Sequence, residues 1–191
     1  MNMDERGSKT GCLSASAIRI VTPSADEATI LIPALAGILI DCVEGGASVS
    51  FMLPIDHRIA EDFYKGVIDK IASEGTILFV AFLDAEPVGT VQLTPAPQPN
   101  QPHRADVNKL LVHRRGRNRG IAQALMTAVE ETATARGRTL LCLDTATGSA
   151  AERLYEKLGW QRLGVMPRHA MWPQGGFCDT TFFWKDLTVS S

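Results

Sequence analysis

The sequence predicts a single α/β domain, and three observations support this prediction. Its 191 residues match the usual length of one domain, about 100–200 residues. Hydrophobic residues make up 45% of the chain and charged residues 21%, which is ordinary for a globular protein. In the second half a strand, a glycine-containing turn, a helix and another strand follow one another, which is typical of a βαβ unit with a parallel strand pair.

The first half opens with a polar, aperiodic stretch over 1–15 that we expect to be a disordered tail, so the domain should cover 16–188. Ser24 followed by Glu27 forms a capping box, which predicts a helix to about Val43, broken or kinked near Pro33. An N-cap aspartate, a four-residue apolar repeat and a closing glycine predict a second helix from Asp56 to Gly75. The strands expected in this half are Ala17–Val21, Thr76–Leu83 and Val88–Leu93.

The second half begins with a proline-rich surface loop, Pro95–His103. Apolar residues at four-residue spacing predict a helix from Ile121 to Arg136. A second capping box, Ser149 with Glu152, opens a short helix that Gly159 ends. The strands expected here are Asp106–Val112, Thr139–Leu143, Gln161–Val165 and Thr180–Lys185. The predicted order of elements is therefore β α α β β β α β α β β.

Composition excludes several classes of function. The formal net charge of −2 gives no general attraction to nucleic acid or to an anionic membrane. The longest apolar run, Ile30–Ile40, is shorter than the roughly 20 residues of a membrane span, and the polar N-terminus lacks a signal core. We therefore expect a cytoplasmic protein. No metal site is expected, because the cysteines lack ligand spacing; they are Cys12, Cys42, Cys142 and Cys178.

The most informative segment joins a predicted strand to a predicted helix and is strongly basic. Its arginines are Arg114, Arg115, Arg117 and Arg119. Without these four charges the chain would carry −6, so the positive charge is compact and suits a small polyanion better than a polynucleotide. Unpaired amides at the helix N-terminus attract phosphate, and Gly116 and Gly120 permit close backbone approach. Because arginines oppose the helix dipole, we expect a bound anion to offset them. The alternative is a solvated basic loop.

Two motifs carry a resemblance to a known family. Arg117-x-x-Gly120-x-Ala122 resembles the acetyl-CoA signature of the GNAT superfamily of N-acetyltransferases, and Tyr155-x-x-x-Gly159-Trp160 resembles its second motif. The resemblance covers about residues 17–187. It implies the GNAT fold, a mixed and mostly antiparallel sheet with a splayed central parallel pair and helices on both faces. It also implies acetyl-CoA as co-substrate, without a metal.

A narrower similarity is to the tabtoxin resistance proteins, which acetylate a small, amino-acid-like toxin. It is carried by Gly45–Met52, Arg104–Leu110, Leu143–Thr145 and Gly148-Ser149. It implies a small-molecule amine acceptor and a role in detoxification. The alternatives are a protein or peptide N-acetyltransferase and a non-catalytic acyl-CoA-binding domain. Long loops, Pro95–His103 and the one after Glu44, favour a closed acceptor pocket. We expect a monomer or homodimer.

The resemblance also implies roles for individual residues. Tyr155 is the general-acid candidate, because a phenol is protonated at neutral pH; the alternative is a packed tyrosine. Asp106 and Asp144 are candidates for the base, acting directly or through water, or for amine binding; Asp144 alternatively caps a turn. His103 and His169 lie where loops can line the acceptor pocket. The implied cofactor-binding residues are Leu110, Leu111, Val112, Arg117, Asn118, Arg119, Gly120, Ile121, Ala122 and Tyr155.

Overall fold

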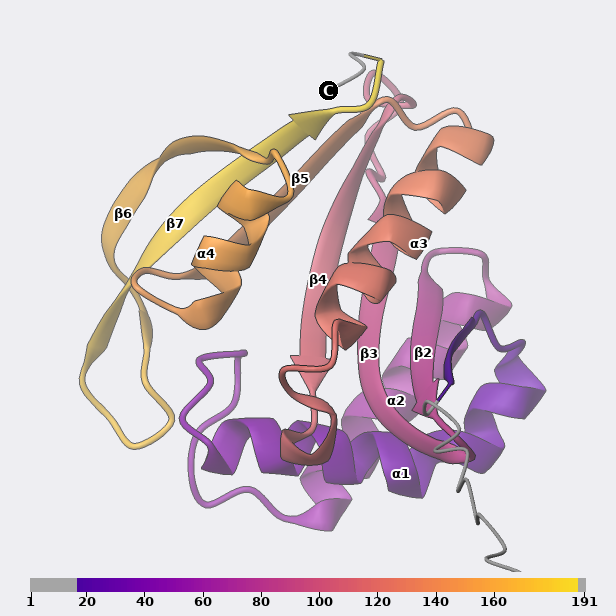
Figure 1. The fold of residues 1–191 in the computed structure, drawn as a ribbon, viewed down its shortest axis with the longest axis vertical. Helices are drawn as coiled ribbons and strands as arrows, with labels where there is room; N and C mark the ends of the chain where they lie inside the picture. Colours follow the sequence, from indigo (N-terminus) through magenta and orange to yellow (C-terminus); the bar gives the residue numbers. More distant parts are fainter. Residues whose placement is uncertain (1–16, 189–191) are drawn as a thin grey trace, which may run out of the picture.

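The computed structural model describes residues 17–188, so the tail predicted over 1–15 lies outside the described residues. One seven-stranded sheet carries helices on both faces (Figure 1). The elements are β1 (Ile18–Val21), α1 (Ala25–Glu44), α2 (His57–Ala72), β2 (Ile77–Leu83), β3 (Glu86–Pro95), β4 (Arg104–Val112), the 3₁₀ turn η1 (Arg114–Gly116), α3 (Ile121–Ala135), β5 (Leu140–Ala146), α4 (Ala150–Lys157), β6 (Gln161–Met171) and β7 (Phe177–Asp186). The predicted order of helices and strands is confirmed.

The sheet is mixed, with the strand order β1-β2-β3-β4-β5-β7-β6. Its parallel pair is β4–β5, and all other neighbours in the described sheet are antiparallel. The parallel ladder is short, since its register ends where Asp106 meets Cys142. Beyond this point β4 and β5 diverge, as Figure 1 shows. The splayed parallel pair expected from the family resemblance is therefore confirmed.

The core is divided between the two faces of the sheet. Because side chains alternate along a strand, β2 serves both faces. Phe79 and Ala81 pack with α3, whereas Leu78 and Val80 pack with α1 and α2. This explains why β2 reads as a continuous apolar run rather than as an alternating one. Within residues 17–188, none of the helices combines the length and hydrophobicity that a membrane span requires.

Helix α1 begins as predicted but is not interrupted. The Ser24 hydroxyl accepts a hydrogen bond from the Glu27 amide, and the Glu27 carboxylate accepts one from the Ser24 amide at 2.8 Å. The predicted break near Pro33 is wrong, because α1 runs through it as one element. Burial of Leu35 and Leu39 against the sheet outweighs the roughly 3 kcal/mol cost of an internal proline.

The last two strands are longer than predicted. The predicted strand ends at Val165, yet β6 continues through Pro167 to Met171. This is possible because β6 is an edge strand and its register shifts between Met166 and Ala170. An edge position or a bulge tolerates a proline, since the missing N–H is not needed there. Strand β5 also extends to Ala146, so that Asp144 lies within it.

Candidate functional site

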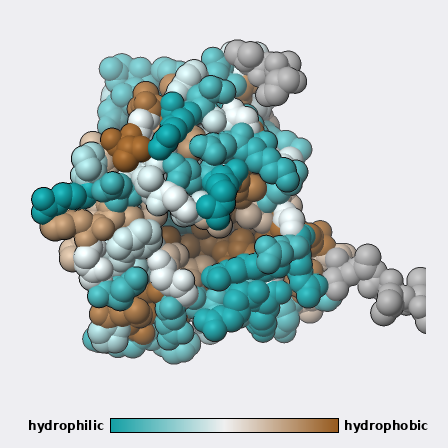
Figure 2. Space-filling model, turned by 60° about the vertical axis from the view of Figure 1, so that its left-hand side comes forward, coloured by the Kyte–Doolittle hydropathy of each residue, from teal (hydrophilic) through white to brown (hydrophobic). Residues whose placement is uncertain are grey.

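A cavity of about 960 Å³ opens where β4 and β5 separate. Both strands contribute to its wall, together with the loop after α1, the start of α4 and the β6–β7 hairpin. The lining consists of Gly45–Met52, Val107–Leu110, Arg117, Asp144–Ala151, Tyr155, His169–Trp172 and Thr180. Figure 2 brings the β6–β7 side forward and shows a recess with hydrophobic residues on its floor and hydrophilic residues at its rim.

The structure brings Asp144 and Tyr155 to the same cavity. The ring of Tyr155 is buried on α4, with ring centroids 6.0 Å from Trp160 and 5.9 Å from Phe183. No hydrogen bond from its hydroxyl is found among residues 17–188. Burial, and then the negative charge of Asp144, raise the pKa of Tyr155 above its usual value. The phenol is therefore protonated at neutral pH and can donate a proton to a group in the cavity.

Asp144 is exposed to the cavity on the part of β5 that has separated from β4. On its other side the strand is paired, with Asp144 opposite Phe182 of β7. No donor within the described part of the chain bonds its carboxylate, and the turn cap considered as an alternative role is absent there. The carboxylate is thus held in place by the strand and is free to accept a proton or to bind an amine.

Asp106, the other candidate for the base, does not lie with Asp144 and Tyr155 in the lining of the cavity. It lies on the part of β4 that still pairs with β5, and it does not line the cavity. Its carboxylate forms an ion pair with Arg104 at 2.5 Å. Residues two apart on a strand share a face, which brings the two side chains together. The structure therefore gives Asp106 a partner on its own strand and leaves it outside the lining of the cavity to which Asp144 and Tyr155 belong.

The start of α3 presents unpaired amides, as the sequence predicted. Gly120 caps the helix with φ +78°, without a side-chain cap. Across the residues that the structure describes, no acceptor lies within hydrogen-bond reach of the Ile121, Ala122 and Gln123 amides. The amide of Arg117, also expected to face the cofactor, instead donates to the Arg114 carbonyl at 3.4 Å. The free amides and the helix dipole together form an anion-binding end.

A buried aspartate on α1, which sequence reasoning missed, holds this loop. Asp41 accepts a 2.8 Å hydrogen bond from the Arg114 amide and another from the Arg114 guanidinium. Arg117 and His113 each approach it to 3.6 Å. Burial alone would raise the pKa of Asp41, but the hydrogen bonds from Arg114 and the charges of His113 and Arg114 lower it below its ordinary value.

Asp41 corrects one expectation about the basic loop. We expected a bound anion to offset all four arginines, whereas Arg114 and Arg117 already face an internal carboxylate. Arg115 and Arg119 are exposed, and no ion pair joins them to any residue in 17–188. The positive charge available to a ligand at the start of α3 therefore comes mainly from these two side chains and the free amides.

One of the two expected loop walls closes the cavity. In the loop after α1, the Ser48 hydroxyl donates to the Met171 carbonyl at 2.8 Å, and the Leu53 amide donates to the Pro173 carbonyl at 2.9 Å. These bonds join the loop to the β6–β7 hairpin. The other expected wall, 95–103, does not line the cavity, and neither does its His103. His169 does line it, and bonds Thr180 at 3.2 Å.

Glu152 has a different role from the predicted one. The Ser149 hydroxyl caps α4 as expected, accepting from the Glu152 amide at 3.1 Å. The buried Glu152 carboxylate, however, does not complete a capping box. It accepts from the Gly148 amide and, at 2.8 Å, from the Thr181 hydroxyl of β7. Glu152 thus bonds Gly148 and Thr181 instead of its own N-cap amide, and these bonds tie the cavity-lining turn after β5 to β7.

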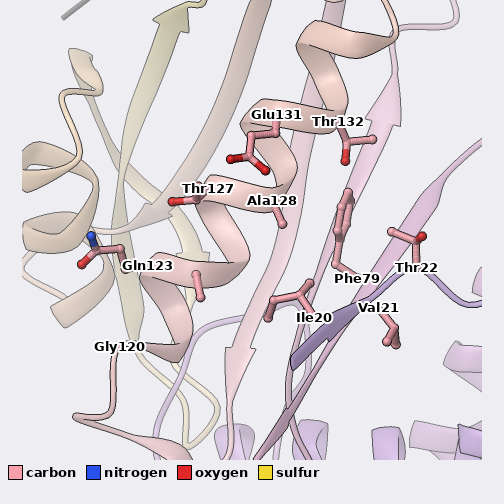
Figure 3. Close-up of a pocket in the computed structure, with 11 residues that line it drawn as sticks. Ile20, Val21, Thr22, Phe79, Gly120, Gln123, Thr127, Ala128, Glu131 and Thr132 are labelled. Atoms are coloured by element: carbon pink, nitrogen blue, oxygen red, sulfur yellow. The ribbon is translucent and has the colours of Figure 1, made fainter. Parts of the chain in front are cut away.

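A second, shallower groove of about 670 Å³ runs along α3 opposite β1 and β2. Figure 3 shows Ile20, Val21 and Phe79 on one side and the α3 side chains on the other. The groove reaches Gly120 but shares no lining residue with the first cavity. Apart from Gly120, none of the candidate site residues lines it. Within 17–188, no group of three His, Cys, Asp or Glu side chains is placed to hold a metal ion.

The sheet is split at its parallel pair, and the helix that follows β4 begins with unpaired amides that suit a phosphate-bearing ligand. Residues 50–160, more than half of the chain, match the acetyltransferase (GNAT) family. The chain belongs to this family, and the fold expected from the two motifs is confirmed. Acetyl-CoA is the co-substrate of GNAT acetyltransferases.

One relative is similar in sequence, and two solved structures are similar in fold. An uncharacterized N-acetyltransferase encoded in the hisH-hisA intergenic region of Azospirillum brasilense is 36% identical over 106 residues, which are 54% of this chain and 61% of that protein. Ribosomal-protein-alanine N-acetyltransferase from Brucella melitensis superposes with a TM-score of 0.74 at 22% identity, covering 88% of this chain and 99% of that one. The structure of yncA from Salmonella typhimurium, a putative acetyltransferase solved with its cofactor acetyl-CoA, superposes with a TM-score of 0.72 at 17% identity. The superposition covers 90% of this chain and 94% of that one.

Proposed function

We propose that this protein is an N-acetyltransferase that moves the acetyl group of acetyl-CoA directly to the amine of a small, amino-acid-like acceptor. One observation carries the proposal: Tyr155 and Asp144 line a single cavity at the split between β4 and β5. The free amides of α3 begin a few residues after β4 ends. Arg117, which lies in the loop between them, lines the same cavity as Tyr155 and Asp144.

The residues present fit acetyl-CoA. The unpaired amides of α3 and the exposed Arg115 and Arg119 suit its pyrophosphate. The edge of β4 over 110–112 is unpaired on the β5 side and can receive the extended, amide-containing arm of the cofactor in the way a sheet edge receives a strand. When bound, acetyl-CoA supplies the activated thioester carbonyl.

The chemistry needs two proton transfers, and the cavity offers one group for each. The acceptor nitrogen forms a bond to the acetyl carbon while the carbon–sulfur bond breaks and its electrons leave with sulfur. Tyr155 donates its phenolic proton to that sulfur. Asp144 takes a proton from the acceptor amine, directly or through one water molecule. We assign this second transfer to Asp144 alone, because Asp106 is paired with Arg104 and does not line the cavity.

A small acceptor is favoured over a peptide. The bonds from Ser48 and Leu53 to the β6–β7 hairpin join two walls of the cavity, and a more enclosed cavity suits a small acceptor better than an extended peptide. The similarity to tabtoxin resistance proteins in Gly45–Met52 also points to an amino-acid-like compound, and this loop lines the cavity. A detoxifying role is part of the proposal and depends on the same similarity.

Thermal melts of the full chain with and without acetyl-CoA test the cofactor. At about 100 times its dissociation constant a ligand adds roughly 2.7 kcal/mol to the free energy of unfolding, a rise of about 5–10 °C for a domain of this size. Desulfo-CoA, which lacks the thioester, serves as a control for nucleotide binding. An unchanged melting temperature would refute the proposal. A rise without CoA release from any of a panel of amines would favour the non-catalytic alternative.

A further inference from the structure

The cavity contains a lysine in a demanding backbone conformation. Lys109 lies on β4 with φ +54°, at the point where the register between β3 and β4 shifts. Its ammonium nitrogen donates a 2.8 Å hydrogen bond to the hydroxyl of Ser50, whose own φ is +77°. Side chains that carry a β-carbon rarely adopt this left-handed region, and such residues cluster at functional sites. Two of them meet here on the cavity wall.

The charge of Lys109 is only partly satisfied by the protein. An ammonium group has three N–H donors, and Ser50 takes one of them. None of the salt bridges among residues 17–188 includes Lys109. Burial lowers the pKa of this lysine, and the nearby Lys70 lowers it further, whereas the charge of Asp144 raises it. A partly buried cation with two unused donors is stabilised by an anionic ligand.

Asp144 lines the same cavity and carries the opposite charge. Its charge acts on Lys109, yet no direct ion pair joins these two described residues. The cavity therefore presents a cation from β4 and an anion from β5 on the two strands that separate. A ligand with an amine at one end and a carboxylate at the other can satisfy both groups, whereas a plain amine would leave Lys109 unmatched.

We propose that Lys109 binds the carboxylate of the acceptor, so that the acceptor is a zwitterionic amino acid or amino-acid-like amine. This inference rests on the proposed function, because it assigns the amine to Asp144. Lys109 is a specificity residue here and takes no part in proton transfer. Ser50, in the loop after α1, positions its ammonium group.

The test uses matched pairs of acceptors. CoA release is measured at saturating acetyl-CoA for the twenty L-amino acids, for β-alanine and γ-aminobutyrate, and for the carboxamide of each. A carboxamide keeps the amine but lacks the carboxylate. Its amine is also less basic and thus more often unprotonated, so a preference for the free acid would oppose intrinsic reactivity. We expect at least one free acid to have a kcat/KM about tenfold or more above that of its carboxamide.

Variants then assign the preference to one side chain. In Lys109→Met the new side chain is also unbranched, so the strain of the left-handed backbone conformation at this position should be unchanged. This variant should raise KM for the preferred acid about 10- to 100-fold, leave kcat within about threefold and leave the carboxamide unchanged. Lys109→Arg should restore part of the affinity. Lys70→Met is the matched control, because it removes a nearby charge that does not line the cavity; it should behave as wild type.

The outcomes separate this inference from the function on which it rests. Equal or better turnover of carboxamides, or equal loss of both acceptors in Lys109→Met, would overturn the assignment of Lys109. A melting temperature that acetyl-CoA does not change would instead overturn the proposed function.

Discussion

Replacing Asp41 by asparagine should destabilise the protein by about 2 kcal/mol. The carboxylate accepts two hydrogen bonds from Arg114, and hydrogen bonds to charged groups contribute about 1.5–3 kcal/mol each. The guanidinium bond counts for less, about 0.5–1 kcal/mol, because the Arg114 side chain is 61% exposed and screened by water. Asparagine can keep one of the bonds through its carbonyl oxygen, but its amide group then faces the other donor.

Urea denaturation of wild type and Asp41→Asn measures this difference, and the melting temperature should fall by about 4–8 °C. Asp62→Asn is the control, since Asp62 and its partner Lys65 are both 59% exposed, and it should cost no more than about 0.5 kcal/mol. Because Asp41 holds the loop before α3, the variant should also bind acetyl-CoA about three- to tenfold more weakly. A variant as stable as Asp62→Asn would refute the reasoning about Asp41.

Three further predictions concern the same region and the acid. Tyr155→Phe should lower kcat about 100-fold in steady-state kinetics. A titration should show that its affinity for acetyl-CoA stays within about twofold of wild type. Equal losses in kcat and in affinity would contradict the general-acid role. In calorimetric titrations, Gly120→Glu should show no binding of acetyl-CoA. Gly120→Ala has the same left-handed strain but no charge and should keep most of the affinity. Similar affinities of the two variants would argue against an anion site. The pKa of Asp41 is depressed from 3.8 in the folded state, so its stabilising effect is complete above that value and is lost as the pH falls through the folded pKa. The difference in unfolding free energy between wild type and Asp41→Asn should therefore narrow as the pH falls below 3.8, and a constant difference would count against this reasoning.

Local signals predicted most of the fold. The caps at Ser24 and Asp56 are formed as expected, because a capping side chain bonds amides only a few residues away. Predictions from neighbouring residues were wrong where a residue distant in the sequence offered a competing contact. Glu152 turned to Thr181 rather than to its own N-cap, and Pro167 was absorbed into an edge strand. Neither partner can be recognised from neighbouring residues.

The site was predictable only where it follows family motifs. Tyr155 and Asp144 line the cavity. Asp106 instead forms an ion pair with Arg104, a residue only two positions away in the sequence. Asp41 carried a usable signal, since a lone acid in the apolar run of α1 needs a partner when buried. Lys109 carried none, because its position depends on the shift in register between β3 and β4.

The short ladder between β4 and β5 has a mechanical consequence. Three residue pairs, ending at Asp106 and Cys142, join a four-stranded plate to a three-stranded one. Within residues 17–188 no pairing joins β4 and β5 beyond these pairs, so a small rotation about them would widen or narrow the cavity without breaking the sheet. The Ser48–Met171 and Leu53–Pro173 bonds span the open end and oppose such a rotation. We therefore expect the two loop bonds to limit how far the two parts of the sheet can move apart.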